Sequence, residues 1–473
     1  MDSNPNFKSA KHLSFISSLI HQTGIRSVFP LGVLGIYVIS YFKFKDDSSI
    51  YLSFFFFPIL TSFFTLFVPI GGVLEKVVGM RITLAISSLV LMLAGYLLSL
   101  KESAGFSIVC YLIFGAGLGI SAMVSVKATC YFYPDKKGMI TSLLNSFSSV
   151  GVAIFNIIGD FVLINPEREQ MVDNKYYKKE IAEKFVNYVY FIMFVIPIFT
   201  IIAIIFASLS ERKKSIALQE EEEQRISLQP ADEKETESDR NNSKALTPEE
   251  LNAQNKEKYK RDLKKIFTSF GIWRLFFECF LTSFLPLLVF NSHKTIALVN
   301  GRNQTVMVIT SSVASVCLAF INPLWGYLYD KFSFKPLIIY MGIAGAFNGV
   351  FFLVAIFYDS LITLSVVFNN SLLAAANSIF FPHIMKIYGL KYSLEASGVI
   401  GLGIGITGIL GAAFCYIINE MFDTNAMSYY ISYGVGSGLC LLSLVFSLFE
   451  KEEKFVYDDD EPKEENTNKI ETL

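Results

Sequence analysis

Charged residues are scarce in this sequence. Asp, Glu, Lys and Arg make up 17% of its 473 residues, below the roughly 25% that is usual for soluble domains. The formal charge is only −2, whereas hydrophobic residues reach 52%, with 45 Phe against 2 Trp. The composition predicts an integral membrane protein, with the lipid bilayer as a partner. It offers no basic surface of the kind that binds nucleic acid.

Residues that commonly bind metals or carry out catalysis are also few. The four histidines are scattered, and neither HExxH nor GxSxG occurs. The six cysteines lie in or beside apolar runs without CxxC spacing, as small core residues do. A Gly-x-Gly-x-x-Gly pattern at 403–408 has no strand before it, so it indicates close helix packing and not a dinucleotide site. We expect no enzyme activity, no metal and no cofactor.

Apolar stretches of roughly 20 residues, long enough to cross a bilayer, recur twelve times. The expected spans lie near 25–42, 51–71, 82–100, 106–132, 139–163 and 187–208, and then near 267–291, 304–326, 337–357, 360–384, 394–418 and 427–449. The sequence therefore predicts an all-α membrane protein of twelve transmembrane helices in two six-helix halves.

The remaining segments are polar and resemble solvated chain. Within the central one, Thr247-Pro-Glu-Glu predicts the start of a short amphipathic helix over 248–264. The expected parts are a cytoplasmic N-terminal segment (1–24), an N-terminal half (25–208), a largely disordered cytoplasmic linker (209–266), a C-terminal half (267–449) and an acidic cytoplasmic tail (450–473).

Lysine and arginine predict the orientation in the membrane. An even number of spans places both termini, the linker and four short loops on one side. Those loops carry Lys76, Arg81, Lys136, Lys137, Lys331, Lys335, Lys386 and Lys391. The positive-inside rule makes this side cytoplasmic. We expect a monomer in the plasma membrane or an organelle membrane.

The clearest motif is Gly326-x-Leu-x-Asp-Lys-x-Ser-x-Lys335, which lies between two apolar runs. It resembles the loop between the second and third helices of each half of major facilitator superfamily transporters. A less perfect copy, Gly72-Val-Leu-Glu-Lys-Val-Val-Gly-Met-Arg81, lies about half a chain earlier; its acid, Glu75, falls one position early and Lys76 takes its place. Two copies indicate two similar halves. The resemblance implies the major facilitator fold and a gating role for Gly72, Glu75, Gly79, Arg81, Gly326, Asp330, Lys331 and Lys335.

A second resemblance concerns the loop after the fourth expected span. It runs Tyr131-Phe-Tyr-Pro-Asp-Lys-Lys-Gly-Met-Ile-Thr141 and is similar to the WFPDKRGLITG signature of the oxalate/formate antiporter family, close kin of the monocarboxylate porters. The motifs typical of sugar porters after the sixth and twelfth spans are missing. Also missing are the Arg of the eighth span and the Lys of the eleventh with which oxalate transporters bind their dianion. The resemblance implies a small organic anion such as a monocarboxylate, but not oxalate.

Ionisable side chains inside the spans are candidate substrate contacts, because burying one in lipid costs at least about 2.5–3.5 kcal/mol. In the resembled fold, spans one, four, seven and ten line a central cavity. Span seven carries Arg274, Glu278 and Thr282 on one helix face. Arg274 could contact an anion and Glu278 could carry a proton. Alternatively, Arg274 reaches the headgroups while it pairs with Glu278.

Span four carries Lys127, which could hold an anion, pair with Glu278 or anchor at the headgroups. Arg26 in span one is expected to be a headgroup anchor. Asn370 and Asn377 share a face of span ten and could bind a carboxylate or a zwitterion. Such amides equally well hold membrane helices together.

On span five, Asn145 and Asn156 are expected to hold the two halves together. Cations that face the cavity would favour an anionic substrate, whereas amides with Glu278 alone would favour a neutral or cationic one. We expect a secondary transporter whose halves rock about a midplane site, moving a monocarboxylate-type anion by proton symport or anion exchange. The alternatives are a transporter of amino acids or other neutral polar solutes, and a non-transporting receptor or scaffold that signals through its linker.

Overall fold

The computed structural model describes residues 4–46, 52–164, 171–172, 176–228, 248–299, 304–355, 358–421, 426–449 and 455. Its N-terminal half contains α1 (Pro5–Ile25), η1 (Arg26–Val28), α2 (Pro30–Asp46), α3 (Ser53–Ser99), α4 (Ala104–Cys130), α5 (Lys137–Ile157), the π-helix η3 (Ile158–Ile164) and α7 (Phe185–Leu228). Between η3 and α7 lie the short antiparallel strands β1 (Met171–Val172) and β2 (Tyr176–Tyr177), followed by α6 (Lys179–Ala182).

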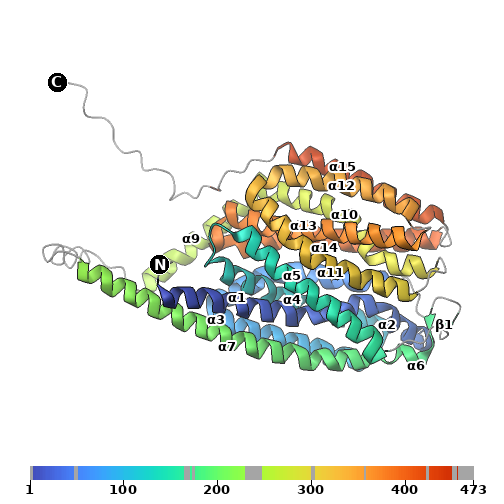
Figure 1. The fold of residues 1–473 in the computed structure, drawn as a ribbon, viewed down its shortest axis with the longest axis horizontal. Coiled ribbons are helices and arrows are strands. Elements are labelled where there is room, and N and C mark those ends of the chain that lie inside the picture. The colour runs from blue at the N-terminus through green and yellow to red at the C-terminus, as the bar shows by residue number, and fades with distance from the viewer. Residues whose placement is uncertain are drawn as a thin grey trace, which may run out of the picture.

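After α9 (Pro248–Thr268), the C-terminal half contains α10 (Phe270–Val299), α11 (Gln304–Phe332), α12 (Phe334–Ala355), α13 (Asp359–Ile387), α14 (Gly389–Met421) and α15 (Ala426–Ser447). The helices run roughly along the long axis of the molecule, and the two halves lie side by side (Figure 1). We call the two ends of this bundle the α9 end, where α1 also begins, and the α6 end, where β1 lies (Figure 1).

The predicted twelve-helix, all-α membrane fold is confirmed. Ten described stretches are long and apolar enough to cross a membrane. One of them, Phe55–Ser99, contains two helices, because Gly79 interrupts α3 with φ 81° and ψ 163°. Helices α1 and α2, with η1 as the break between them, are not among these ten stretches and correspond to the first predicted span. Helices are what the bilayer demands, since each satisfies its backbone hydrogen bonds internally.

The first helix begins about twenty residues earlier than predicted. In α1, the Ser17 hydroxyl donates to the carbonyl of Ala203 at 2.8 Å, and the Ser210 hydroxyl of α7 donates to the carbonyl of Ala10 at 2.7 Å. Gln22 is also buried in this helix. The boundary at residue 25 is therefore wrong, and α1 is part of the bundle. Hydropathy did not predict α1 because this helix is rich in polar side chains. Inside the bundle, these side chains are buried and donate hydrogen bonds to backbone carbonyls of neighbouring helices.

The predicted linker is more ordered than expected. Helix α7 continues to Leu228, and the side-chain amides of Asn4 and Asn6 each donate to the carboxylate of Glu220 at 2.9 Å. The amphipathic helix expected over 248–264 is confirmed as α9. The rest of the linker, 229–247, and nearly all of the tail lie outside the described residues.

The two halves pack through two helix pairs that occupy matching places in the repeat, α3 with α14 and α5 with α11. A Cβ on Gly405 would lie 2.8 Å from Cα of Ser62, whose hydroxyl donates to the Gly405 carbonyl at 2.7 Å. A Cβ on Gly326 would lie 2.5 Å from the carbonyl oxygen of Gly138. The Gly-x-Gly-x-x-Gly pattern is thus a helix-packing feature, as predicted.

Gly79 provides a test of the break in α3. Its backbone angles are essentially restricted to glycine and cost other residues about 1–3 kcal/mol, while a Cβ there would meet nothing within 4 Å. Gly79→Ala should therefore lower the free energy of unfolding in detergent by about that amount. Gly434→Ala is the matched control, because that glycine is also uncrowded but helical, and alanine there should not destabilise. Equal effects of the two substitutions would contradict this account.

Candidate functional site

A cavity of about 130 Å³ lies between the two halves. Phe29, Phe57 and Phe290 give it an aromatic wall toward the α6 end, together with His293 on α10. Helices α5, α11 and α13 supply amides and hydroxyls: Asn145, Ser148, Ser149, Asn156, Ser315, Asn322, Asn370 and Asn377. Both halves therefore contribute polar groups to one space.

Arg26 brings positive charge to this cavity. It lies in η1, where the chain breaks before α2 begins at Pro30, a residue suited to a helix start because it lacks an N–H. Its Cζ lies 4.4 Å from the centre of the Phe29 ring. No described residue forms an ion pair with Arg26, and none of the described lining residues is acidic. Arg26 thus lies on the cavity, and a guanidinium there suits a carboxylate.

The asparagines of three helices lie around this cavity. Asn370 and Asn377 line the cavity from α13, as the face predicted for span ten requires. Asn145 and Asn156, expected only to hold the halves together, line it from α5, and Asn322 lines it from α11. A sequence signal for α5 existed, because Asn145 and Asn156 are eleven residues apart, about three helical turns.

The other predicted substrate contacts lie away from the described cavity lining. Glu278 and Thr282 are buried in α10, where the Thr282 hydroxyl donates to the Glu278 carbonyl at 2.7 Å. Arg274 donates to the carbonyl of Phe449 at 2.9 Å. Lys127 pairs with Glu75 at 2.6 Å within the N-terminal half and not with Glu278. These four residues therefore do not join Asn370 and Asn377 around one site.

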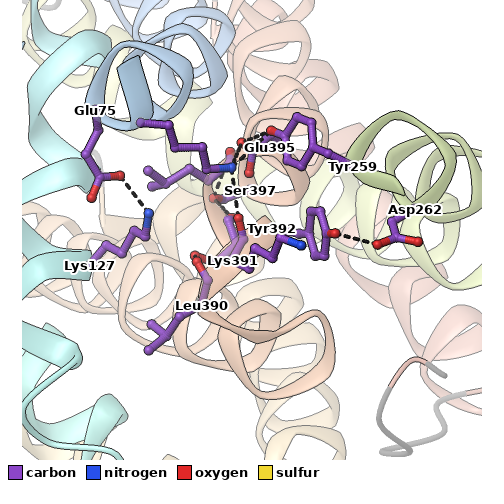
Figure 2. Close-up of polar contacts among 12 residues, drawn as sticks. Glu75, Lys127, Tyr259, Asp262, Leu390, Lys391, Tyr392, Glu395 and Ser397 are labelled. Atoms are coloured by element: carbon purple, nitrogen blue, oxygen red, sulfur yellow. Dashed lines mark hydrogen bonds and ion pairs between the residues drawn. The ribbon is translucent and has the colours of Figure 1, made fainter. Parts of the chain in front are cut away.

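Figure 2 shows a polar cluster that joins the two halves at the α9 end. The Lys76 ammonium lies 2.6 Å from the Glu395 carboxylate and donates to the carbonyl of Lys391 at 2.9 Å. It also donates to the Tyr259 hydroxyl at 3.0 Å, and that hydroxyl donates to Glu395 at 2.5 Å. Burial, with the hydrogen bond to Glu395 and its charge, raises the pKa of Tyr259, so the hydroxyl keeps its proton. Helix α9 is thus a third partner in this contact between α3 and α14.

The second copy of the motif makes the matching contact with opposite charge. The Asp330 carboxylate accepts from the backbone N–H groups of Gly138 at 3.2 Å and Met139 at 3.0 Å, in the first turn of α5. An acid there stabilises the positive end of the helix. Lys76 stands four residues after Gly72, as Asp330 stands four residues after Gly326. In the first copy, the ion pair between Lys76 and Glu395 therefore takes the place of the contact that Asp330 makes in the second copy.

Apolar side chains complete the closure at this end. One buried cluster combines Val68, Ile140 and Leu144 of the N-terminal half with Phe381, Met385 and Leu394 of the C-terminal half. Gly72 lies against it, since a Cβ there would be 2.9 Å from Cβ of Leu394. The halves are therefore packed together at the α9 end.

Comparison with known proteins agrees with this architecture. The family model described as "Major Facilitator Superfamily" matches residues 14–299. The chain belongs to the major facilitator superfamily. It is therefore a multi-pass membrane transporter and not an enzyme. The match does not separate branches of the superfamily, so the oxalate/formate or monocarboxylate branch stays a prediction.

Solved structures of the superfamily share the fold. The proton:xylose symporter XylE, bound to 6-bromo-6-deoxy-D-glucose, aligns with a TM-score of 0.63 at 13% identity, over 95% of this chain and 97% of its own. A bacterial homologue of the human drug peptide transporters PepT1 and PepT2 aligns with 0.60 at 12%, over 93% and 97%. A D-xylose-proton symporter aligns with 0.58 at 14%, over 94% and 99%. No curated protein matches the sequence.

The pair of Lys76 and Glu395 can be measured by a double-mutant cycle on the unfolding free energy, with Lys76→Met, Glu395→Gln and both. Because the Glu395 side chain is only 4% exposed, we expect a coupling of about 1–3 kcal/mol, within the range found for residues in contact. The pair of Arg81 and Glu211 is the control, since its side chains are 52% and 47% exposed and such pairs contribute about 0–1 kcal/mol. A Lys76–Glu395 coupling no larger than that of the control would contradict a gate held by this ion pair.

Proposed function

We propose that this chain is a secondary active transporter of a small organic anion, and that Arg26 holds the negative charge. The observation that carries the proposal is a guanidinium on the cavity with no acidic side chain among the described lining residues. Charges buried in proteins need a counter-charge, and here a solute can supply it. Arg26 thereby takes the role that the sequence suggested for Lys127 or Arg274.

The contacts between the halves at the α9 end support transport by alternating access. Both halves line it, while Lys76–Glu395 and the Asp330 contact hold the halves together at the α9 end. Rocking of the halves would break these contacts and open that end, as in alternating access. If the Lys- and Arg-rich side is cytoplasmic, this conformation closes the cavity toward the cytoplasm, with both termini on that side.

His293 is the candidate group for proton coupling. His293 is 3% exposed and lines the same cavity as Arg26, and histidine is the side chain that changes charge near neutral pH. Two of the structural relatives are described as proton symporters, which supports a proton as a partner. Proton symport and anion exchange both remain compatible with this cavity.

An amino acid or a neutral polar solute is the alternative, and the five asparagines of the cavity favour it. A zwitterion, however, would place its ammonium in a space whose described lining offers no carboxylate and already holds Arg26. The anion therefore fits better. A non-transporting scaffold would have no use for a polar cavity that both halves line.

The test is thermal stabilisation of the purified protein by a panel of carboxylates, amino acids and nucleosides, since a ligand of the folded state raises its midpoint by mass action. Carboxylates should raise the midpoint of the wild-type protein. Arg26→Gln should weaken their binding by about 10- to 150-fold, the loss of a hydrogen-bonded charge partner of about 1.5–3 kcal/mol. Lys127→Met should keep the shift, because Lys127 pairs with Glu75 outside this cavity. A carboxylate shift that survives Arg26→Gln and disappears in Lys127→Met would refute the proposal.

A further inference from the structure

Helix α9 turns one face toward the bundle. On this inner face, the Tyr392 hydroxyl of α14 donates to the Asp262 carboxylate at 2.5 Å (Figure 2). The rings of Tyr259 and Tyr392 stack with their centres 5.5 Å apart. Ile266, one turn after Asp262, is fully buried. The inner face is therefore fixed against α14, and the outer face is left for another molecule.

The outer face of α9 is basic. Lys260, Arg261 and Lys264 are exposed and follow one another at the spacing of a single helix surface. Of the exposed residues that the structure describes between 257 and 264, three are cations and one, Glu257, is an acid. No described residue forms an ion pair with Lys260 or Lys264. These two ammonium groups are therefore open to an anionic partner.

Exposed aromatic side chains continue this surface into the membrane. Phe267 ends the outer face of α9, and Phe270 and Trp273 follow on α10, where they are 71% and 46% exposed. Helix α10 is one of the stretches that can cross a membrane, so these two rings lie against lipid. The Trp273 indole N–H donates to the Phe267 carbonyl at 2.9 Å, which holds its ring at the junction of the two helices. Because tryptophan is enriched where a membrane meets water, this junction should lie at the level of the headgroups.

We propose that the outer face of α9 binds the headgroups of anionic phospholipids through Lys260, Arg261 and Lys264. The positive-inside rule predicts that the α9 end faces the cytoplasm, and the cytoplasmic leaflet carries anionic lipids. Each lysine or arginine beside such a surface strengthens its binding by about 5-fold. The proposal holds whichever solute the central cavity carries.

The combination of cations with lipid-facing aromatic rings decides the class of partner. An acidic protein segment, such as the tail with its Asp458-Asp-Asp-Glu461, would also complement three cations. It would leave the adjoining surface of Phe270 and Trp273 to lipid, however, and so would match only half of the continuous surface. A phospholipid matches both halves, because its chains lie against the rings while its headgroup reaches the cations.

The two tryptophans of the chain make a local test possible. Trp273 lies at the proposed site, whereas Trp325 is only 7% exposed, and Trp325→Phe leaves Trp273 as the sole fluorophore. The full-length protein is placed in nanodiscs of phosphatidylcholine that contain an equal mole fraction of either brominated phosphatidylcholine or brominated phosphatidylserine. Bromine quenches indole fluorescence only at short range, so the quenching reports the lipid beside Trp273. If Trp325→Phe does not fold, the wild-type protein serves, because its Trp325 is buried and adds a constant background.

Brominated phosphatidylserine should quench Trp273 with a relative binding constant about 5- to 25-fold above that of brominated phosphatidylcholine, as one to two cations would produce. Lys260→Gln combined with Lys264→Gln should lower this ratio by at least about 5-fold. Lys178→Gln combined with Lys179→Gln is the matched control, because these lysines are equally exposed but lie at the α6 end; its ratio should equal that of the wild type. Quenching by brominated phosphatidylcholine should be the same in all three proteins, which shows that they are folded.

Three outcomes would overturn the proposal. The first is equal quenching of the wild-type protein by the two lipids, as expected if an acidic segment occupied the outer face. The second is a preference for phosphatidylserine that survives the loss of Lys260 and Lys264. The third is an equal loss of preference in the control variant, because the preference would then follow the net charge of the protein and not this surface.

Discussion

A bilayer offers no hydrogen-bond partners to a polypeptide backbone, and this constraint decides the shape of the whole chain. Helices meet it without help, so a break in a helix must lie where other protein groups or a cavity can receive the freed backbone. The break at η1 obeys this rule, because it opens beside the cavity that Arg26 and Phe29 line. The break at Gly79 is the turn between the two spans of α3, three residues after Lys76. The departure from regular helix at η1 thus coincides with the place where function is proposed.

The first break has an electrostatic consequence. Helix α2 begins at Pro30, next to Phe29 on the cavity wall. The negative end of α1 and η1 lies at the same break, so the dipoles of the two segments oppose one another there. Arg26 is therefore the charge that distinguishes this wall of the cavity.

The sequence predicted what depends on local pattern and missed what depends on tertiary contact. Most spans, the two halves and helix α9 follow from apolar length and from capping residues. Helix α1 was missed because hydropathy records the lipid-facing surface, whereas the Ser17 hydroxyl and the Gln22 amide nitrogen donate to backbone carbonyls inside the bundle. Arg26 was taken for an anchor because its depth along the span is visible in sequence but the break at η1 is not. Asn370 and Asn377 were found because the resembled fold directs attention to span ten, while α5 had no such guide.

The motif copy at 72–81 departs from the family pattern, but it still forms a polar contact between the two halves. Replacing an acid by lysine at the position of Lys76 would repel the positive end of a helix, but Glu395 on α14 supplies the carboxylate instead. In this contact the base, Lys76, comes from the motif, and the acid, Glu395, comes from the facing helix α14. Glu75, which the shift left without its usual place, pairs with Lys127. The sequence analysis therefore proposed Lys127 as a substrate contact, although Lys127 pairs with Glu75 of the altered motif.

Arg26 also bears on the choice between symport and exchange. Closing the empty cavity on both sides would remove its guanidinium from water without a counter-charge, and such an uncompensated charge costs several kcal/mol. A bound carboxylate removes most of that penalty, so the loaded protein should change conformation more readily than the empty one. Under the proposed function, this penalty acts on the return of the empty protein, a step that symport requires and exchange does not.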